Sequence, residues 1–205
     1  MKISLLVSAR RKNMIKNQLE KVFERYQMIY KKILVSNRFY PSLDSTGFQE
    51  RNLTVNFSKA YEQVYANDNV ISWFELQFGE NKNNHFDCLI INMDRKEIFF
   101  IESKRFSNVK TKTSSVAKDI ERIEGFVNKD RLVDNRFKDF SEFAINGVIL
   151  ADVWHETPSK IEVYEKFKTK TFFKGTKDGI YDVKTINNIA DCRPYSLLSF
   201  VWKIK

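Results

Sequence analysis

Residues 86–104, FDCLIINMDRKEIFFIESK, consist of two apolar runs on either side of the polar segment 92–96. This pattern predicts a β-hairpin with strands over residues 86–91 and 97–103. The second apolar run has no polar residue between positions 98 and 101, which is typical of a strand buried on both faces. We therefore expect residues 97–103 to lie in the middle of a sheet.

The predicted hairpin carries three ionisable residues that we expect to converge. Side chains two positions apart on a strand share a face, so Glu102 and Lys104 project together while Ser103 points away. Asp87 stands in the preceding strand. A turn at the polar segment pairs residues whose numbers sum to about 188, which places Asp87 opposite Ile101 and next to Glu102.

The acid-x-Lys pattern alone is weak, because it occurs four times in the chain, beginning at Glu80, Asp94, Glu102 and Asp182. Only Glu102 ends a hydrophobic strand, where a carboxylate is costly unless a positive group meets it. Two explanations fit. One is a buried ion pair between Lys104 and either acid of the hairpin. The other is a metal site in which hard carboxylate oxygens select Mg²⁺ or Mn²⁺.

Helical and strand-like patterns surround the hairpin. Apolar residues at helical spacing predict a helix over residues 50–65, and a run of β-branched and aromatic residues predicts a strand over 70–78. After the hairpin, a second helical pattern covers 116–127 and a buried strand covers 145–153. Residues 48–155 therefore have the order αβββαβ, which predicts an α/β core with a mixed central sheet flanked by helices.

The two ends of the chain extend this core. Residues 11–34 have apolar positions at helical spacing opposite a charged face, which predicts an amphipathic helix packed on the domain or on a second subunit. Residues 35–48 are typical of a connecting loop. The lysine-rich C-terminal part has strand-like pieces at 161–167 and 171–173 and a closing strand at 197–204. We divide the chain into an N-terminal helical extension, a core and a C-terminal β-rich extension of the same domain, at residues 1–47, 48–155 and 156–205.

The composition fits a compact domain with a polyanionic partner. At 205 residues, with 42% hydrophobic and 14% aromatic residues, the chain can bury a sizeable core. No apolar run approaches the ~20 residues of a membrane-spanning helix, so we expect a cytoplasmic protein without a membrane partner. The net charge of +9 favours binding to phosphates, although solubility alone also explains it.

The hairpin motif resembles the active-site signature of the PD-(D/E)XK nuclease superfamily. In that signature an aspartate precedes a buried strand that ends in acid-x-Lys. Here Asp87 precedes Glu102 by fourteen intervening residues, and Lys104 completes the pattern. The predicted αβββαβ order over residues 48–153 is also similar to the core of that superfamily, and the chain departs from it in having Phe86 where the superfamily name has a proline. The resemblance implies a restriction endonuclease-like fold.

The resemblance also implies a Mg²⁺- or Mn²⁺-dependent endonuclease or exonuclease that hydrolyses phosphodiester bonds, with DNA as the expected substrate. Asp87 and Glu102 would bind the metal, which polarises the phosphodiester and lowers the pKa of the attacking water. Lys104 would orient that water or stabilise the negative charge of the transition state. The alternative function is a nucleic-acid-binding or assembly protein that keeps the nuclease fold without catalysis.

Glu50 is a candidate third acid. Residues 50–53, ERNL, are similar to the E-R-x-L context of the first core helix in archaeal Holliday junction resolvases. The resemblance implies that Glu50 reaches the metal or its water shell. A glutamate in the first turn of a helix also interacts favourably with the helix dipole, which is a purely structural explanation. Glu62 and Glu75 are competing candidates for the same role.

Five basic residues are candidates for nucleic-acid contacts. Arg105, Lys110 and Lys112 follow the predicted catalytic strand, the two lysines in a polar loop, where the neighbours of a scissile phosphate would run. Lys118 and Arg122 lie one turn apart on the following helix, although a solvated helix face explains them as well. Cutting both strands of a duplex would favour a homodimer, for which the N-terminal helix offers an interface.

Overall fold

The computed structural model describes residues 2–36, 50–78, 85–106, 109–128, 140, 142–155, 157–169, 179–187 and 194–205, with the side chains of the first helix from residue 17 onward. The helices are α1 (Lys2–Ser36), α2 (Glu50–Val64), α3 (Val109–Asn128) and α4 (Pro158–Lys168). The strands are β1 (Val70–Gln77), β2 (His85–Asn92), β3 (Glu97–Arg105), β4 (Ala144–Trp154), β5 (Gly179–Ile186) and β6 (Tyr195–Lys203).

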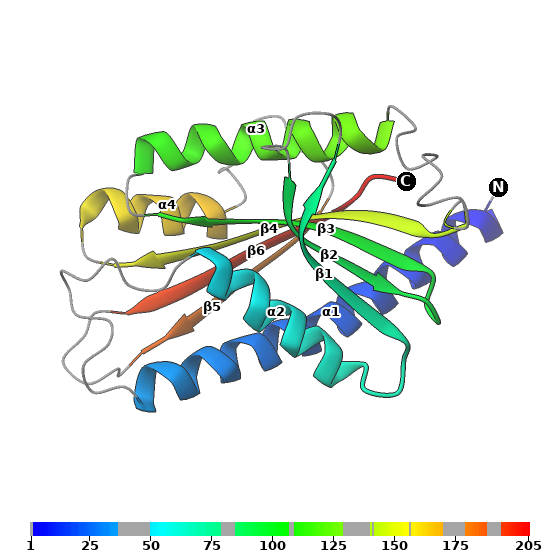
Figure 1. The fold of residues 1–205 in the computed structure, drawn as a ribbon, viewed down its shortest axis with the longest axis horizontal. Helices are drawn as coiled ribbons and strands as arrows, with labels where there is room; N and C mark the ends of the chain where they lie inside the picture. Colours follow the sequence, from blue (N-terminus) through cyan, green and yellow to red (C-terminus); the bar gives the residue numbers. More distant parts are fainter. Residues whose placement is uncertain are drawn as a thin grey trace.

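These strands form one mixed sheet in the order β1-β2-β3-β4-β6-β5. Neighbouring strands are antiparallel except β3 and β4, which are parallel and are connected through α3. In Figure 1, α1 and α2 lie on one face of the sheet and α3 and α4 lie on the other. Each face has its own core of buried apolar side chains. The predicted α/β class with a mixed central sheet flanked by helices is therefore confirmed.

The hairpin of β2 and β3 forms as predicted, but its register differs by one residue. The order from α2 to β4 is helix, three strands, helix and strand, and β3 lies between β2 and β4 with residues 98–103 buried. Cys88, rather than Asp87, lies opposite Ile101. Asp87 is the next residue along β2, so it is level with Glu102.

Helix α3 begins at Val109, so the prediction of a loop around Lys110 and Lys112 is wrong. Both lysines lie in the first turns of the helix. This segment is rich in threonine and serine, which have low helix propensity because their hydroxyls compete for backbone hydrogen bonds. Here the hydroxyls of Thr113 and Ser115 donate to carbonyls four residues earlier in the same helix, so they do not interrupt it.

The C-terminal part contains a helix that the sequence pattern concealed. Residues 161–167, predicted as strand-like, belong to α4, and Pro158 occupies its first turn, where proline is well tolerated. Val163 and Phe167 are buried four residues apart, as a helix requires. Strand β5 was not predicted, the closing strand is confirmed as β6, and the predicted piece 171–173 lies outside the described residues.

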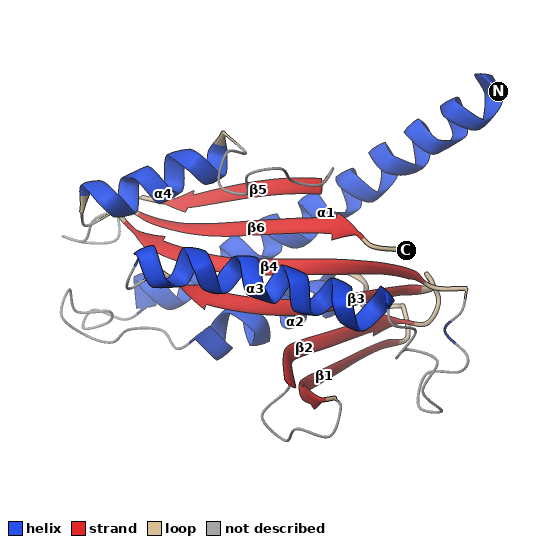
Figure 2. Cartoon of the chain, turned by 90° about the horizontal axis from the view of Figure 1, so that it is seen from above, coloured by secondary structure: helices blue, strands red, loops and turns tan. Residues whose placement is uncertain are grey.

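Helix α1 packs on its own chain, which answers the question that its amphipathic pattern left open. Its buried residues share a core with α2 and the sheet, and Tyr26 meets Phe57 of α2 edge-on. The N-terminal part of α1 projects beyond the sheet in Figure 2. Among the described helices, none is long and apolar enough to cross a membrane. Of the loop predicted over residues 35–48, positions 37–48 lie outside the description, and Val35 and Ser36 are helical.

The regular pairing of β1 with β2 is interrupted at Glu75 and Asp87, which have no partner in the strand register. Glu75 has a φ of 54°, in the left-handed region that a non-glycine residue adopts only at a cost. On β2, Cys88 belongs to the core beside α1 and α2, whereas Phe86 belongs to the core beside α3. Regular alternation would place both on one face. The outer end of the hairpin therefore bends toward α3, as Figure 1 shows.

Helix α3 is held across the sheet by aromatic contacts. Trp202 Nε1 of β6 donates to Glu124 Oε1 of α3 at 3.0 Å. The indole fits over Gly147 of β4, where a Cβ atom would come within 2.2 Å of the ring. In the same C-terminal turns of α3, Phe126 packs edge-on against Phe86 on the bent part of β2. These contacts fix the C-terminal end of α3 on the sheet.

Candidate active site

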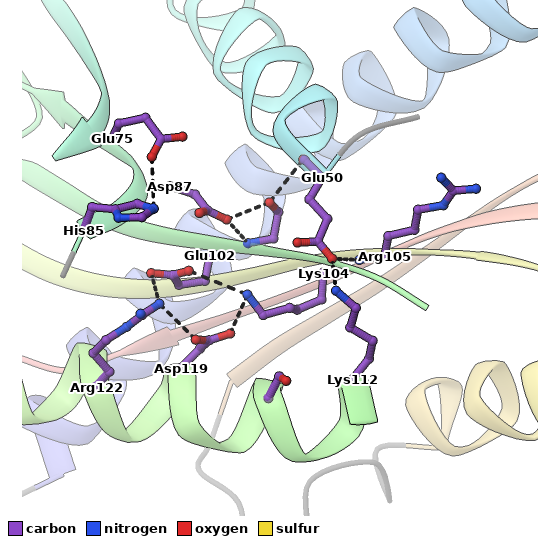
Figure 3. Close-up of polar contacts among 12 residues, drawn as sticks. Glu50, Glu75, His85, Asp87, Glu102, Lys104, Arg105, Lys112, Asp119 and Arg122 are labelled. Carbon is purple, nitrogen blue, oxygen red and sulfur yellow. Dashed lines mark hydrogen bonds and ion pairs between the residues drawn. The ribbon is translucent and has the colours of Figure 1, made fainter. Parts of the chain in front are cut away.

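Asp87 is fixed at the point where the hairpin bends. Its Oδ2 atom accepts hydrogen bonds from the Ser103 backbone N–H at 2.8 Å and from Ser103 Oγ at 2.7 Å. Ser103 Oγ also lies 3.1 Å from the Glu50 carbonyl oxygen, an alternative acceptor for the same proton. Ser103 points away from Glu102, as predicted, and it joins β2, β3 and the first turn of α2. Figure 3 shows this junction.

A cluster of charged side chains lies at this end of β3 and consists of Asp87, Glu102, Lys104, Asp119 and Arg122. Glu102 is the most deeply buried acid of the cluster, with 1% of the residue exposed. Burial raises its pKa to about 8, and the nearby Asp87 carboxylate adds to the rise, while Arg122 and Lys104 oppose it. Its two oxygens both face cations. Oε1 lies 2.5 Å from Arg122 Nη2, and Oε2 lies 3.9 Å from Lys104 Nζ.

Lys104 shares a face with Glu102, as the strand period predicts, and it is held by α3. Its Nζ atom lies 2.8 Å from Asp119 Oδ2. Burial lowers the pKa of Lys104, but attraction to Asp119, Glu102 and Asp87 outweighs this effect, so the pKa is raised above its ordinary value. The side chain is therefore an ammonium at neutral pH. An ammonium can serve either role expected of Lys104, because it can donate a hydrogen bond to the attacking water or stabilise the negative charge of the transition state.

Asp119 belongs to the cluster, and sequence reasoning did not single it out. It is a buried acid on the inner face of α3, where it contacts Lys104 and also accepts from Arg122 Nη2 at 2.9 Å. A signal was present, because position 119 falls between Val116 and Ile123 on the apolar stripe of the helix. A carboxylate on an apolar stripe requires a buried cation nearby.

Glu50 lies at the first residue of α2 and beside, rather than within, the acid pair. Its Oε1 atom accepts a hydrogen bond from the Arg105 N–H at 3.0 Å and forms an ion pair with Lys112. Within the described part of the chain, no group of three or more acidic, histidine or cysteine side chains is arranged to hold a metal ion. Glu50 therefore does not make a three-ligand site with Asp87 and Glu102 in this arrangement.

The competing acids are occupied elsewhere. Glu62 accepts a hydrogen bond from Ser72 Oγ at 2.6 Å, on the α2 side of β1. Glu75, at the bend of the hairpin, lies 3.0 Å from His85 Nε2, and both side chains are partly exposed. Figure 3 shows this pair next to Asp87, at the edge of the cluster.

The five predicted nucleic-acid contacts separate into two groups. Arg122 and Lys112 point into the cluster, where they neutralise Glu102 and Glu50. Lys110 and Lys118 are exposed on α3, and the Arg105 side chain points away from Glu102 in Figure 3. The structure therefore brings together Asp87, Glu102 and Lys104 with Arg122, and it leaves the exposed cations around them.

The donor set fits a hard divalent cation bound through two carboxylates. Asp87 and Glu102 lie one residue beyond Cys88 and Ile101, the last paired residues of β2 and β3, and are close enough for one to raise the pKa of the other. Mg²⁺ commonly uses only one or two protein carboxylates and completes its shell with water and phosphate oxygens. The pair could therefore hold Mg²⁺ or Mn²⁺ without a third protein ligand.

Comparisons with known proteins return nothing similar. No protein-family model matches the chain, and searches of curated proteins and of solved structures find no significant match. The function of the chain must therefore be inferred from the arrangement of Asp87, Glu102 and Lys104.

Proposed function

We propose that the chain is a Mg²⁺- or Mn²⁺-dependent nuclease that hydrolyses phosphodiester bonds of DNA, with a restriction endonuclease-like core of the PD-(D/E)XK type in residues 48–155. The observation that carries this proposal is the meeting of two acids at the bend of the hairpin. Glu102 is buried there with its pKa raised to about 8, partly by Asp87. Carboxylates that repel each other in a buried site gain most from a divalent cation.

The residues of the chain have complementary roles in this reaction. A divalent ion bound by both acids would lower the pKa of an attacking water and polarise the phosphate. Asp87 is pre-organised for such binding by its two hydrogen bonds from Ser103. Lys104 is oriented by Asp119 and stabilises negative charge that develops on the phosphate oxygens. Pre-organised charges of this kind are effective because they need no rearrangement during the reaction.

Glu50 has an auxiliary role beside the two acids. It holds Lys112 and the Arg105 backbone at the end of β3, so these groups lie where the neighbours of the scissile phosphate would bind. The exposed Lys110 and Lys118 of α3 extend the same basic surface. The net charge of +9 supports a polyanionic substrate through counterion release.

A second candidate function is nucleic-acid binding without catalysis. The observation that favours it is that both oxygens of Glu102 already face cations, so Arg122 and Lys104 neutralise the Glu102 carboxylate without a metal. The two functions differ in their response to divalent ions. A ligand that binds only the folded state raises the melting temperature, whereas a purely structural ion-pair network predicts no rise with Mg²⁺ beyond that of ionic strength.

The decisive experiment is cleavage of single-stranded, duplex and branched DNA and of RNA with Mg²⁺ or Mn²⁺. Asp87→Asn and Glu102→Gln should each abolish products. The matched control is the pair Asp182 and Lys184 on β5, an acid-x-Lys pattern whose side chains lie 3.3 Å apart away from the bend. Asp182→Asn should leave cleavage unchanged. DNA binding by the wild type with no cleavage of any substrate would instead support the second candidate.

A further inference from the structure

Arg122 contacts the acid cluster more closely than Lys104 does. Its Nη2 atom lies 2.5 Å from Glu102 Oε1, compared with 3.9 Å between Lys104 Nζ and Glu102 Oε2. The same nitrogen lies 2.9 Å from Asp119 Oδ1, and the guanidinium stands 5.9 Å from the centre of the Phe86 ring. The cation nearest to the predicted metal ligand therefore comes from α3 and not from the acid-x-Lys motif.

A divalent ion and the guanidinium of Arg122 cannot both make their best contacts with Glu102. Both are positive, and both seek oxygens of the same buried carboxylate. On the basis of the proposed nuclease function, we propose that Arg122 is an exchangeable partner of Glu102 that divalent metal displaces and that then binds a phosphate of the nucleic acid. Metal loading would thus release a cation for the substrate.

The surroundings of Arg122 allow this exchange. Asp119 lies three residues earlier on the same helix and contacts Arg122 independently of Glu102, so the guanidinium keeps an anchor after release. Asp119 is itself fixed by Lys104. The Arg122 side chain is 34% exposed, so it already reaches the rim of the cluster. A planar guanidinium with several N–H donors is suited to phosphate recognition.

The exchange predicts how a substitution of Arg122 changes the affinity for metal, which can be measured without an activity assay. A divalent ion brings two positive charges to the acids and displaces at most one proton from Glu102. Loss of the positive charge of Arg122 therefore favours the ion at every pH. Arg122→Gln should bind Mn²⁺ more tightly than the wild type, by roughly tenfold at low ionic strength.

The test is calorimetric titration of the full chain with Mn²⁺ in the absence of nucleic acid. Lys118→Gln is the matched control, because it removes the same charge from an exposed position one turn earlier on α3. It should leave the Mn²⁺ affinity unchanged. Arg122→Leu, which also removes the charge and can pack on Phe86, is a second variant in case Arg122→Gln fails to fold. In the variants that bind Mn²⁺ more tightly, DNA cleavage should fall, because the phosphate contact is lost.

The outcomes separate the exchange from the nuclease function itself. Equal Mn²⁺ affinity in the wild type and the Arg122 variants would overturn the exchange while leaving the metal site intact. Tighter binding in Lys118→Gln as well would also overturn it, because the effect would then come from net charge alone. If neither the wild type nor any Arg122 variant binds Mn²⁺, the proposed nuclease function fails, and the exchange fails with it.

Discussion

Two buried carboxylates on the parallel strands β3 and β4 have opposite surroundings. Glu102 of β3 is 1% exposed and faces α3, where it meets two cations and lies close to a second acid, Asp87. Asp152 of β4 is 2% exposed and lies on the other side of the sheet, where Tyr195 donates a hydrogen bond to it at 2.8 Å. Tyr195 in turn stacks on Tyr30 of α1.

The comparison teaches that equal burial does not give equal chemistry. Burial raises the pKa of both acids, but Glu102 reaches about 8 with a neighbouring carboxylate, whereas Asp152 reaches about 6 with a phenol that stabilises its charge. Asp152, which accepts a hydrogen bond from the Tyr195 hydroxyl, ties β4 to β6. Glu102 is held beside Asp87 by two cations, and a divalent ion bound to both carboxylates would remove the repulsion between them.

The largest expected difference between the two regions is in DNA cleavage. Glu102→Gln should lower the cleavage rate by at least about 10³-fold, because it removes a metal ligand and a negative charge from the reacting centre. Asp152→Asn should retain cleavage, because Asp152 lies on the opposite face of the sheet. Initial rates with Mg²⁺ would measure both. Equal losses in the two variants would show that Asp152 is part of the active site and that the distinction is wrong.

The next effect concerns stability at Asp152. Tyr195→Phe removes the phenol hydroxyl and leaves Asp152 Oδ2 without that donor in the core, which should lower the free energy of unfolding by about 1–3 kcal/mol. Urea denaturation would measure this loss, with Tyr164→Phe on the partly exposed α4 as the control. Cleavage should be unchanged in the folded protein. A loss of cleavage without a loss of stability would contradict the structural role of Tyr195.

The two acids should also differ in how stability depends on pH. A raised pKa in the folded state means that the folded protein keeps a proton that the unfolded chain has released, so stability falls as pH rises through that window. The window runs from 4.5 to about 8 for Glu102 and from 3.8 to about 6 for Asp152. Between pH 6 and 8 only Glu102 contributes, by up to about 1.4 kcal/mol per pH unit.

Denaturation curves at several pH values would test this prediction. The wild type should lose stability relative to Glu102→Gln between pH 6 and 8, whereas its difference from Asp152→Asn should stay constant over the same range. Parallel pH curves for the wild type and Glu102→Gln would show that Arg122 and Lys104 keep the Glu102 carboxylate ionised.

The sequence predicted the part of the site that depends on the period of a strand. The side chains of Glu102 and Lys104 share a face because they are two residues apart, and the unbroken apolar run places β3 in the middle of the sheet. The bend at Asp87 was not predictable, because it depends on a glutamate with positive φ at position 75, for which the sequence has no glycine signal. Asp119 was missed although it falls on the apolar stripe of α3, because the sequence pattern does not show that Lys104 of β3 lies against it.

The errors elsewhere also have physical causes. Helix α4 was mistaken for a strand because Ile161 and Val163 alternate with a glutamate, although Val163 and Phe167 have helical spacing. Strand β5 escaped notice because it lies at the edge of the sheet, where Ile186 is its only buried residue and polar residues interrupt the apolar ones. The partner of α1 could not be chosen, because an amphipathic stripe does not specify which surface covers it.

The smallest effect is expected at Glu142, whose carboxylate forms an exposed ion pair and so contrasts with the two buried acids. Lys96 lowers the pKa of this carboxylate through a hydrogen bond, which would stabilise the folded state above pH 4.5 and lose that stability as pH falls. Both side chains are more than half exposed, so water and salt screen the attraction. Glu142→Gln should therefore leave the melting temperature unchanged at physiological ionic strength, at pH 4 and at pH 7. A clear loss at pH 7 that disappears at pH 4 would show that an exposed pair contributes here. The contrast with Glu102 would then reflect the number of neighbouring charges rather than burial.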